Sequence, residues 1–169
     1  MIFIFLKSLI LVSVMLINLV PLVKYEAPEM TIEQMANEVN LSEDEFIFLS
    51  SVVEAESNRS TDGDLTGRIL IAVTIINRVN SDYFPDTVNG VLTQRNQFST
   101  VRNGHSVTSR TSFSDEAVLE AFELLENEEL PNNILFFNCI GFNYGEPFRL
   151  VEGEDRIGGN YFMTYGEET

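Results

Sequence analysis

Residues 69–76 form the sequence ILIAVTII, which is apolar at every position except Thr74. A helix with apolar side chains on all sides is not stable on a surface, so other elements have to surround it. We therefore predict a helix over residues 65–79, with Asp64 as its N-cap, at the centre of the hydrophobic core. The rest of the chain has to fold around that helix.

Two capping-box patterns mark the helices that precede the central one. In such a box a Ser or Thr side chain accepts a hydrogen bond from the backbone N–H three residues later, and a Glu or Gln at that later position accepts one in return. Thr31 with Gln34 and Ser42 with Glu45 fit this pattern. They predict helices over residues 32–39 and 43–57, the second ending at Glu56 or Ser57.

The remaining segments carry turn, helix and strand signals in that order. We predict a turn-forming loop over residues 58–63, a short helix over 86–92, an extended segment over 94–104 ending in an Asn103-Gly104 turn, a helix over 115–127 capped by Ser114, and strands over 134–138 and 160–164. The Gly-rich stretch between the two strands is predicted to be irregular. Because helices come first and strands later, the pattern favours an α+β fold, with a helical lobe, a small β-sheet lobe and a lysozyme-like groove between them.

The amino-terminal segment stands apart from this fold. Residues 1–23 contain one charged residue, Lys7, and are long enough to span a hydrocarbon core of about 30 Å. No small-x-small cleavage site follows the apolar run, which favours an uncleaved anchor over a signal peptide. We therefore divide the chain into a signal-anchor or signal peptide over residues 1–24, a linker over 25–30 and one globular domain over 31–169.

The charge balance excludes one large class of function. The chain has 10 Lys and Arg against 26 Asp and Glu, a formal net charge of −16, and both lysines lie in or beside the amino-terminal apolar run. So acidic a domain repels phosphate backbones, which argues against nucleic-acid binding. A single Cys and a single His, Cys139 and His105, exclude a disulfide framework and a multi-Cys zinc site. We expect a monomer without metal or cofactor.

The sequence Glu54-Ala-Glu56 lies at the end of the helix predicted over residues 43–57. At 100° per residue, Glu56 falls on the apolar face of that helix and Glu54 on the opposite face, toward water. A carboxylate among apolar side chains loses hydration, and the negative end of the helix dipole also disfavours its charge. Both effects favour a protonated Glu56, as a general acid requires. The alternative is a Glu56 that leaves the helix end or pairs with Arg59 or Arg68.

A set of short motifs, taken in order, resembles the SleB-type cell-wall hydrolases, which are spore cortex-lytic enzymes and their relatives. The resemblance covers about residues 45–163. Its motifs are Val53-Glu-Ala-Glu56, Gly67, Ala72-Val-Thr-Ile-Ile-Asn-Arg-Val79, Phe84-Pro-Asp-Thr-Val88, Gly90-Val91, Gln97-Phe-Ser99, Leu135-Phe-Phe-Asn138 and Ile157-Gly-Gly-Asn-Tyr-Phe162. The chain departs from the family in a longer loop between Glu56 and Gly67, and in Asn160, where many relatives have His.

The resemblance implies an extracytoplasmic enzyme, membrane-anchored or secreted, that acts on peptidoglycan glycan strands. It implies that Glu56 is the catalytic acid and that Gln97 lies at the glycan groove. The expected reaction is lytic transglycosylation between N-acetylmuramic acid (MurNAc) and N-acetylglucosamine (GlcNAc), with one Glu as general acid and base. Two alternatives remain: a hydrolysing muramidase, for which Asp62, Asp64 or Asp86 is the second carboxylate, and a non-catalytic wall-binding protein.

Several other residues are candidates for substrate binding. Gln97 can bind sugar hydroxyls or acetamides, or it can be a hairpin residue that bonds only backbone. Phe98 is a candidate contact, although core packing is more typical of such a residue, and Asn138 and Tyr161 can line the groove or bond within the structure. Three further residues are interpreted without a role in catalysis: Asn77 and Arg78 as the structural end of the central helix, and Cys139 as a buried apolar side chain.

Overall fold

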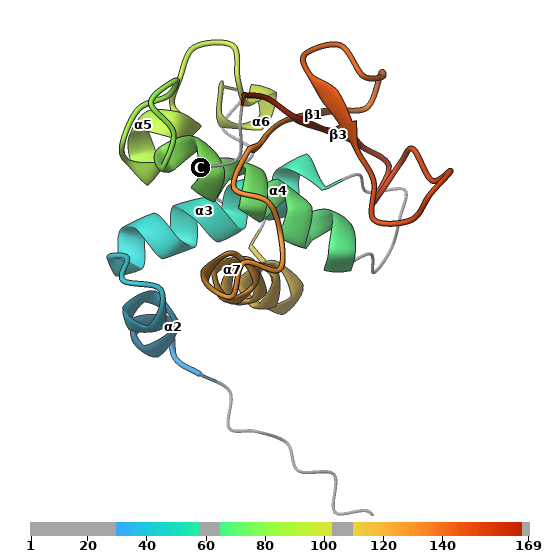
Figure 1. The fold of residues 1–169 in the computed structure, drawn as a ribbon. Coiled ribbons are helices and arrows are strands. Elements are labelled where there is room, and N and C mark those ends of the chain that lie inside the picture. Colours follow the sequence, from blue (N-terminus) through green and yellow to red (C-terminus); the bar gives the residue numbers. More distant parts are fainter. Residues whose placement is uncertain (1–29, 58–64, 103–109, 167–169) are drawn as a thin grey trace, which may run out of the picture.

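The computed structural model describes residues 30–57, 65–102 and 110–166. The helices are α2 (Ile32–Glu38), α3 (Glu43–Glu56), α4 (Leu65–Val79), α5 (Val88–Leu92), α6 (Ser99–Arg102) and α7 (Ser112–Glu126), and the strands are β1 (Ile134–Asn138), β2 (Glu146–Phe148) and β3 (Tyr161–Thr164). Helices precede a small antiparallel sheet, which confirms the predicted α+β class (Figure 1). Within the described ranges, no helix has the length and apolar character needed to cross a membrane. The anchor predicted over residues 1–23 lies outside these ranges.

Helix α4 is the centre of the core, as its apolar sequence predicts. It packs against α7, α3, α5 and β1, and Figure 1 shows it surrounded by the other elements. Ile71, Val73 and Ile75 are fully buried, and Leu70 is nearly so. Each such side chain contributes about 1.5–3 kcal/mol through removal of apolar surface from water. The burial of this one helix therefore determines where the other helices and β1 can pack.

Both predicted capping boxes are present. In α2 the Thr31 hydroxyl accepts from the Gln34 backbone N–H, and the Gln34 side chain accepts from the Thr31 backbone N–H. In α3 the same exchange joins Ser42 and Glu45. The short helix α5 starts at Val88 with Thr87 as its N-cap, within the predicted range.

The predicted start of α7 is wrong by three residues. Thr111, not Ser114, is the N-cap, and Ser114 occupies the third helical position, where it completes the capping box in place of Glu or Gln. The reason is tertiary. The Ser50 hydroxyl in α3 donates to Asp115 at 2.7 Å and lies 2.9 Å from the Ser114 hydroxyl. Arg110 donates to the other oxygen of Asp115 at 2.6 Å. These bonds fix the first turn of α7 against α3.

The extended segment predicted over residues 94–104 is also wrong in its described part. A turn over Gln94–Gln97 leads into α6, a single helical turn over Ser99–Arg102. Thr100 in this turn bonds Glu56, which is 44 residues away in sequence, and no local pattern encodes that contact. The predicted Asn103-Gly104 turn, the loop over residues 58–63 and the Asp64 cap lie outside the described residues.

The sheet has the order β1-β3-β2, with both pairs antiparallel. Strand β1 was predicted with its observed bounds, and β3 starts one residue later than predicted, at Tyr161. Strand β2 lies in the stretch predicted to be irregular, and its Pro147 is tolerated because β2 is an edge strand. Cys139 directly after β1 is exposed, so its interpretation as a buried side chain is wrong. It lies beyond the last paired residue of β1, where the sheet no longer covers it.

Candidate active site

A cavity of about 870 Å³ lies between the end of α3, the segment leading into α6, and the sheet. It corresponds to the groove predicted between the two lobes. Its lining residues are Ala55, Glu56, Ser57, Arg78, Asn96, Gln97, Phe98, Thr100, Phe136, Phe137, Asn138, Cys139, Tyr144 and Asn160. An adjoining cavity of about 690 Å³ shares Glu56 and the 96–98 segment with it. Glu56 therefore lies where the two cavities meet.

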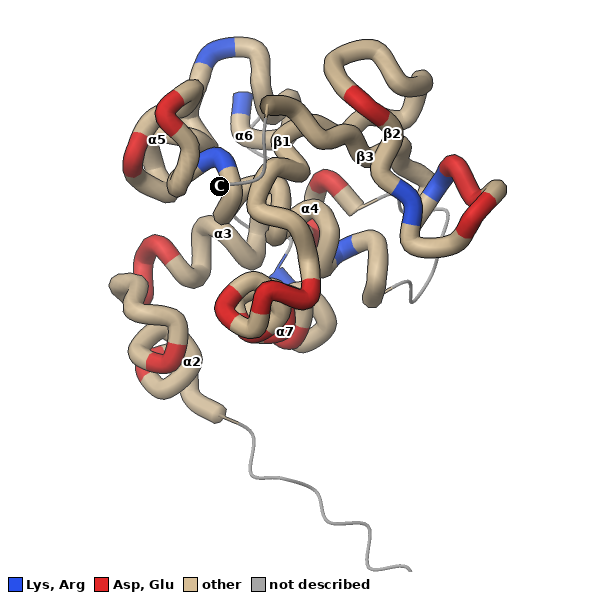
Figure 2. The backbone as a smooth tube through the Cα atoms, in the orientation of Figure 1, with Lys and Arg blue, Asp and Glu red and all other residues tan. Residues whose placement is uncertain are grey.

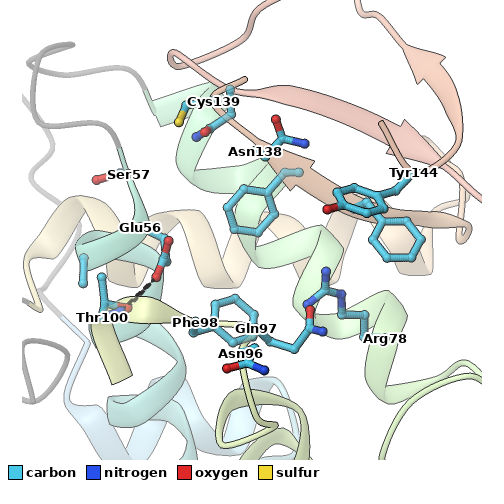
Figure 3. A pocket seen from close by; sticks show the side chains of 14 residues that line it. Glu56, Ser57, Arg78, Asn96, Gln97, Phe98, Thr100, Asn138, Cys139 and Tyr144 are labelled. Atoms are coloured by element: carbon cyan, nitrogen blue, oxygen red, sulfur yellow. Dashed lines mark hydrogen bonds between the residues drawn. The ribbon is translucent and has the colours of Figure 1, made fainter. Parts of the chain in front are cut away.

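Glu56 is positioned by the end of α3 and by α6. Its side chain is half-buried, and its Oε1 accepts a hydrogen bond from the Thr100 hydroxyl at 2.5 Å and one from the Thr100 backbone N–H at 3.4 Å (Figure 3). Two donors on one oxygen restrict the rotation of the carboxyl group, and the other oxygen, Oε2, has no such partner among the described residues. This geometry leaves Oε2 available to a ligand in the cavity.

Glu54 does not point to water, which corrects the expectation drawn from the helical period. It forms a two-bond ion pair with Arg68, at 2.8 and 2.9 Å, and accepts from the Thr111 hydroxyl at 2.8 Å. Its side chain is 17% exposed. The face opposite Glu56 is covered because α4 and the start of α7 pack against it. Arg68 is thereby paired with Glu54, and Arg59, the other predicted partner of Glu56, lies outside the described residues.

Three of the four predicted substrate-binding residues line the same cavity as Glu56. Gln97 is exposed in the turn before α6, so it is not a hairpin residue. Phe98 is 4% exposed and also belongs to the core. Asn138 is the last residue of β1. Tyr161 is not among the lining residues, although it pairs with Asn138 across the sheet. Its ring contacts Phe142, at a centroid distance of 5.0 Å.

Two asparagine side chains at the cavity each have a buried amide nitrogen without a hydrogen-bond partner among the described residues. Asn138 Oδ1 accepts from the backbone N–H groups of Ile140 and Gly141, but its Nδ2 is buried and has no partner within the described ranges. Asn160 is 5% exposed, and its Nδ2 likewise has no partner within the described ranges. Buried polar groups are normally hydrogen-bonded, so these two are candidate donors to a ligand.

The fold also brings residues to the cavity for which the sequence predicted no place there, among them Thr100, Phe136, Tyr144 and Arg78. Thr100 follows the Gln97-Phe-Ser99 motif by one residue, which is the one local signal that could have found it. Tyr144 is 61% exposed and stacks on Phe136 with centroids 5.6 Å apart. Arg78 was interpreted as structural, and it does donate to the Leu135 carbonyl, but it also lines the cavity.

The candidate second carboxylates are not placed beside Glu56. Asp86 is exposed and lines neither cavity. Asp62 and Asp64 lie outside the described residues, and so does His105. Among the described residues that line the two cavities, Glu56 is the one carboxylic acid.

Comparisons with known proteins find similarity to enzymes of the cell wall and the spore cortex. A family model described as Cell Wall Hydrolase matches residues 63–146. A spore cortex-lytic enzyme of Oceanobacillus iheyensis is 40% identical over 55 residues, which are 32% of this chain and 20% of that protein. The chain thus matches about a fifth of the length of this curated relative.

Two solved structures share the fold. One is the catalytic domain of the germination-specific lytic transglycosylase SleB from Bacillus anthracis, with a TM-score of 0.56 and 24% identity, covering 73% of this chain and 96% of that one. The other is the catalytic domain of the SleB protein of Bacillus cereus, with a TM-score of 0.56 and 23% identity, covering 73% and 91%. The chain is therefore similar to cell wall hydrolases over residues 63–146, and it shares the fold of the two SleB catalytic domains.

Proposed function

We propose that the domain over residues 31–169 cleaves peptidoglycan glycan strands outside the cytoplasm, by lytic transglycosylation between MurNAc and GlcNAc. The observation that carries the proposal is the position of Glu56. It is the one carboxylic acid among the described residues lining the two joined cavities, and Thr100 orients it there. A cleft with an oriented acid and several amide donors suits a polar, uncharged bond such as a glycosidic linkage.

The reaction that fits one carboxyl group has two proton transfers. Protonated Glu56 donates its proton to the glycosidic oxygen, so the bond from MurNAc C1 to that oxygen breaks and GlcNAc leaves as an alcohol. The resulting Glu56 carboxylate accepts the proton of the MurNAc C6 hydroxyl, whose oxygen attacks C1. A 1,6-anhydro ring forms, Glu56 is protonated again, and no water is consumed.

A hydrolysing muramidase is the alternative in chemistry. An ordinary glycosidase has a second carboxylate about 5–5.5 Å from the first when it retains configuration and about 6.5–9.5 Å away when it inverts. The absence of a second acid among the described lining residues favours the one-carboxylate route. In either case Gln97, Phe98 and Asn138 are proposed substrate contacts. Tyr161 is proposed to act indirectly, through Asn138, with which it pairs across the sheet.

We also propose that residues 1–24 hold the domain at the membrane or direct its export. Beyond residue 24 the chain carries eight Arg against 26 acidic residues, so long-range electrostatics do not draw it to an anionic wall. Attachment to the membrane raises the local concentration of a nearby substrate without any such attraction.

Mass spectrometry of the muropeptides released from purified sacculi tests the function. We expect 1,6-anhydro-MurNAc ends from the parent chain and no release by Glu56→Gln, which keeps the shape and the bond from Thr100. Glu123→Gln, which changes an exposed acid on α7, is the matched control and should be fully active. Reducing MurNAc ends in place of anhydro ends refute transglycosylation in favour of hydrolysis. Sacculus binding without release by the parent refutes catalysis in favour of a wall-binding protein.

A further inference from the structure

Arg78, near the end of α4, is a buried charge at the cavity. Its side chain lines the cavity, yet the residue is only 4% exposed. Nε donates to the Leu135 carbonyl at 2.8 Å. The guanidinium carbon lies 4.9, 5.5 and 5.6 Å from the ring centroids of Phe84, Phe98 and Phe136. The carbonyl and the rings hold the guanidinium in one orientation.

This cation has no counter-ion in the described part of the chain. The ion pairs there join Arg68 to Glu54, Arg110 to Asp115 and Arg149 to Asp155, and none includes Arg78. Nη1 and Nη2 likewise have no hydrogen-bond partner among the described residues. A buried charge is costly unless it is paired, so an unpaired one at a cavity indicates a place for a ligand of opposite charge.

The charge is retained at neutral pH despite burial. Loss of hydration lowers the pKa of Arg78 from its ordinary value to about 10, because the protonated form is the one that burial disfavours. Since this value lies well above 7, the guanidinium stays protonated at neutral pH. In a domain this rich in acid, with acidic residues along α2 and α7 (Figure 2), Arg78 places a fixed positive charge inside the cleft.

We propose that Arg78 binds a carboxylate of the glycan substrate and so selects strands that carry one. Guanidinium groups match carboxylates with two parallel hydrogen bonds, and Nη1 and Nη2 are the atoms left for them. Figure 3 shows Arg78 and Glu56 at opposite sides of the view, with Phe98 and Gln97 between them. A carboxylate on Arg78 therefore binds apart from the acid and positions the sugar across the cleft.

The chemistry of the substrate offers two sources for this carboxylate. MurNAc differs from GlcNAc by its lactyl group, which is a free carboxylate where the stem peptide has been removed. Where the peptide remains, the lactyl group is an amide and the carboxylates belong to the peptide. A muramic lactam residue has neither.

Binding measurements separate this inference from the proposed function on which it rests. The full chain with Glu56→Gln, which cannot turn over its substrate, is titrated calorimetrically with matched glycan strands. The strands carry a free lactyl carboxylate, its methyl ester, an intact stem peptide, or the peptide with its carboxylates amidated. We expect the ester or the amidated peptide to bind about tenfold or more weakly than its acid. The pair of strands in which the acid binds more tightly identifies the source of the carboxylate, either the lactyl group or the stem peptide.

Equal affinity for acid and ester, and for peptide and amidated peptide, overturns the role of Arg78, whereas no binding of any strand overturns the glycan site itself. These titrations keep Arg78, so they do not depend on the folding of an Arg78 variant. Arg78→Lys and Arg78→Gln add a second test. With folding checked by circular dichroism, we expect Lys to keep part of the preference for the acid and Gln to abolish it. A preference unchanged by Gln contradicts the proposal.

Discussion

The hydroxyl of Thr100 lies 2.5 Å from Oε1 of Glu56 and joins α6 to the end of α3. The bond bridges 44 residues of sequence and fixes one oxygen of the proposed catalytic acid. Thr100 makes this contact from the helical turn α6, where the sequence predicted an extended segment.

Removing this bond should affect catalysis more than stability. We expect Thr100→Val to lower kcat by up to about a hundredfold with little change in KM, because a misoriented acid is a poor proton donor. Thr100→Ser keeps the hydroxyl and should restore most of the rate. Thr74→Val is the matched control, since the Thr74 hydroxyl bonds only within α4, to the Leu70 carbonyl. Equal rates for the two Val variants contradict the positioning role.

Glu54 should act on stability and not on the reaction. Glu54→Gln removes the negative charge that pairs with the largely buried Arg68, and we expect the free energy of unfolding to fall by about 1–3 kcal/mol. Urea unfolding measures this, and activity per folded molecule should be retained. The control is Asp155→Asn in the exposed pair with Arg149, which should cost less than about 1 kcal/mol. A loss of activity without a loss of stability in Glu54→Gln contradicts this division of roles.

Gly145 is required by the packing of β2 against β3. A Cβ at this position would overlap the carbonyl oxygen of Thr164, whereas a Cβ at Gly141, four residues earlier, meets nothing within 4 Å. We expect Gly145→Ala to destabilise the fold by about 1–3 kcal/mol through overpacking, and Gly141→Ala to have an effect within about 0.5 kcal/mol. Thermal unfolding of the pair measures the difference, and similar midpoints would show that β2 can shift at no cost.

The capping box of α3 should contribute to stability in a pH-dependent way. Hydrogen bonds from the Ser42 side chain and backbone lower the pKa of Glu45 below its ordinary value of 4.5. Because the folded pKa is the lower one, this contribution is complete above the unfolded pKa and is lost as the pH falls through the folded pKa. Glu45→Gln can still cap but does not titrate, so its unfolding free energy should depend less on pH below about 4.5.

The control for this effect lies in the same turn. Glu43→Gln removes a carboxylate that does not take part in the capping box, so the acid dependence that stems from the box should remain. Urea unfolding of both variants between pH 3 and pH 7 makes the comparison. If both variants match the parent at every pH, the Ser42–Glu45 bonds make no such contribution.

The sequence by itself determined the elements that depend on local chemistry or on strong periodicity. The all-apolar run of α4 specified the centre of the core, and the two Thr/Ser and Gln/Glu boxes specified the starts of α2 and α3. The order of the motifs indicated the similarity to cell wall hydrolases that the comparisons found. The helical period placed Glu56 correctly on the side of α3 that meets the cavity, because side-chain direction on a helix follows from spacing alone.

Tertiary structure decided what depends on contacts between distant segments. It turned the Thr100 segment into α6, moved the start of α7 to Thr111, covered Glu54 with Arg68 and exposed Cys139. It also brought Arg78 to the cavity, a residue whose sequence context indicated only a helix end. Local patterns encode which backbone bonds a segment can satisfy by itself, whereas partners from other segments become available only once the core around α4 has formed.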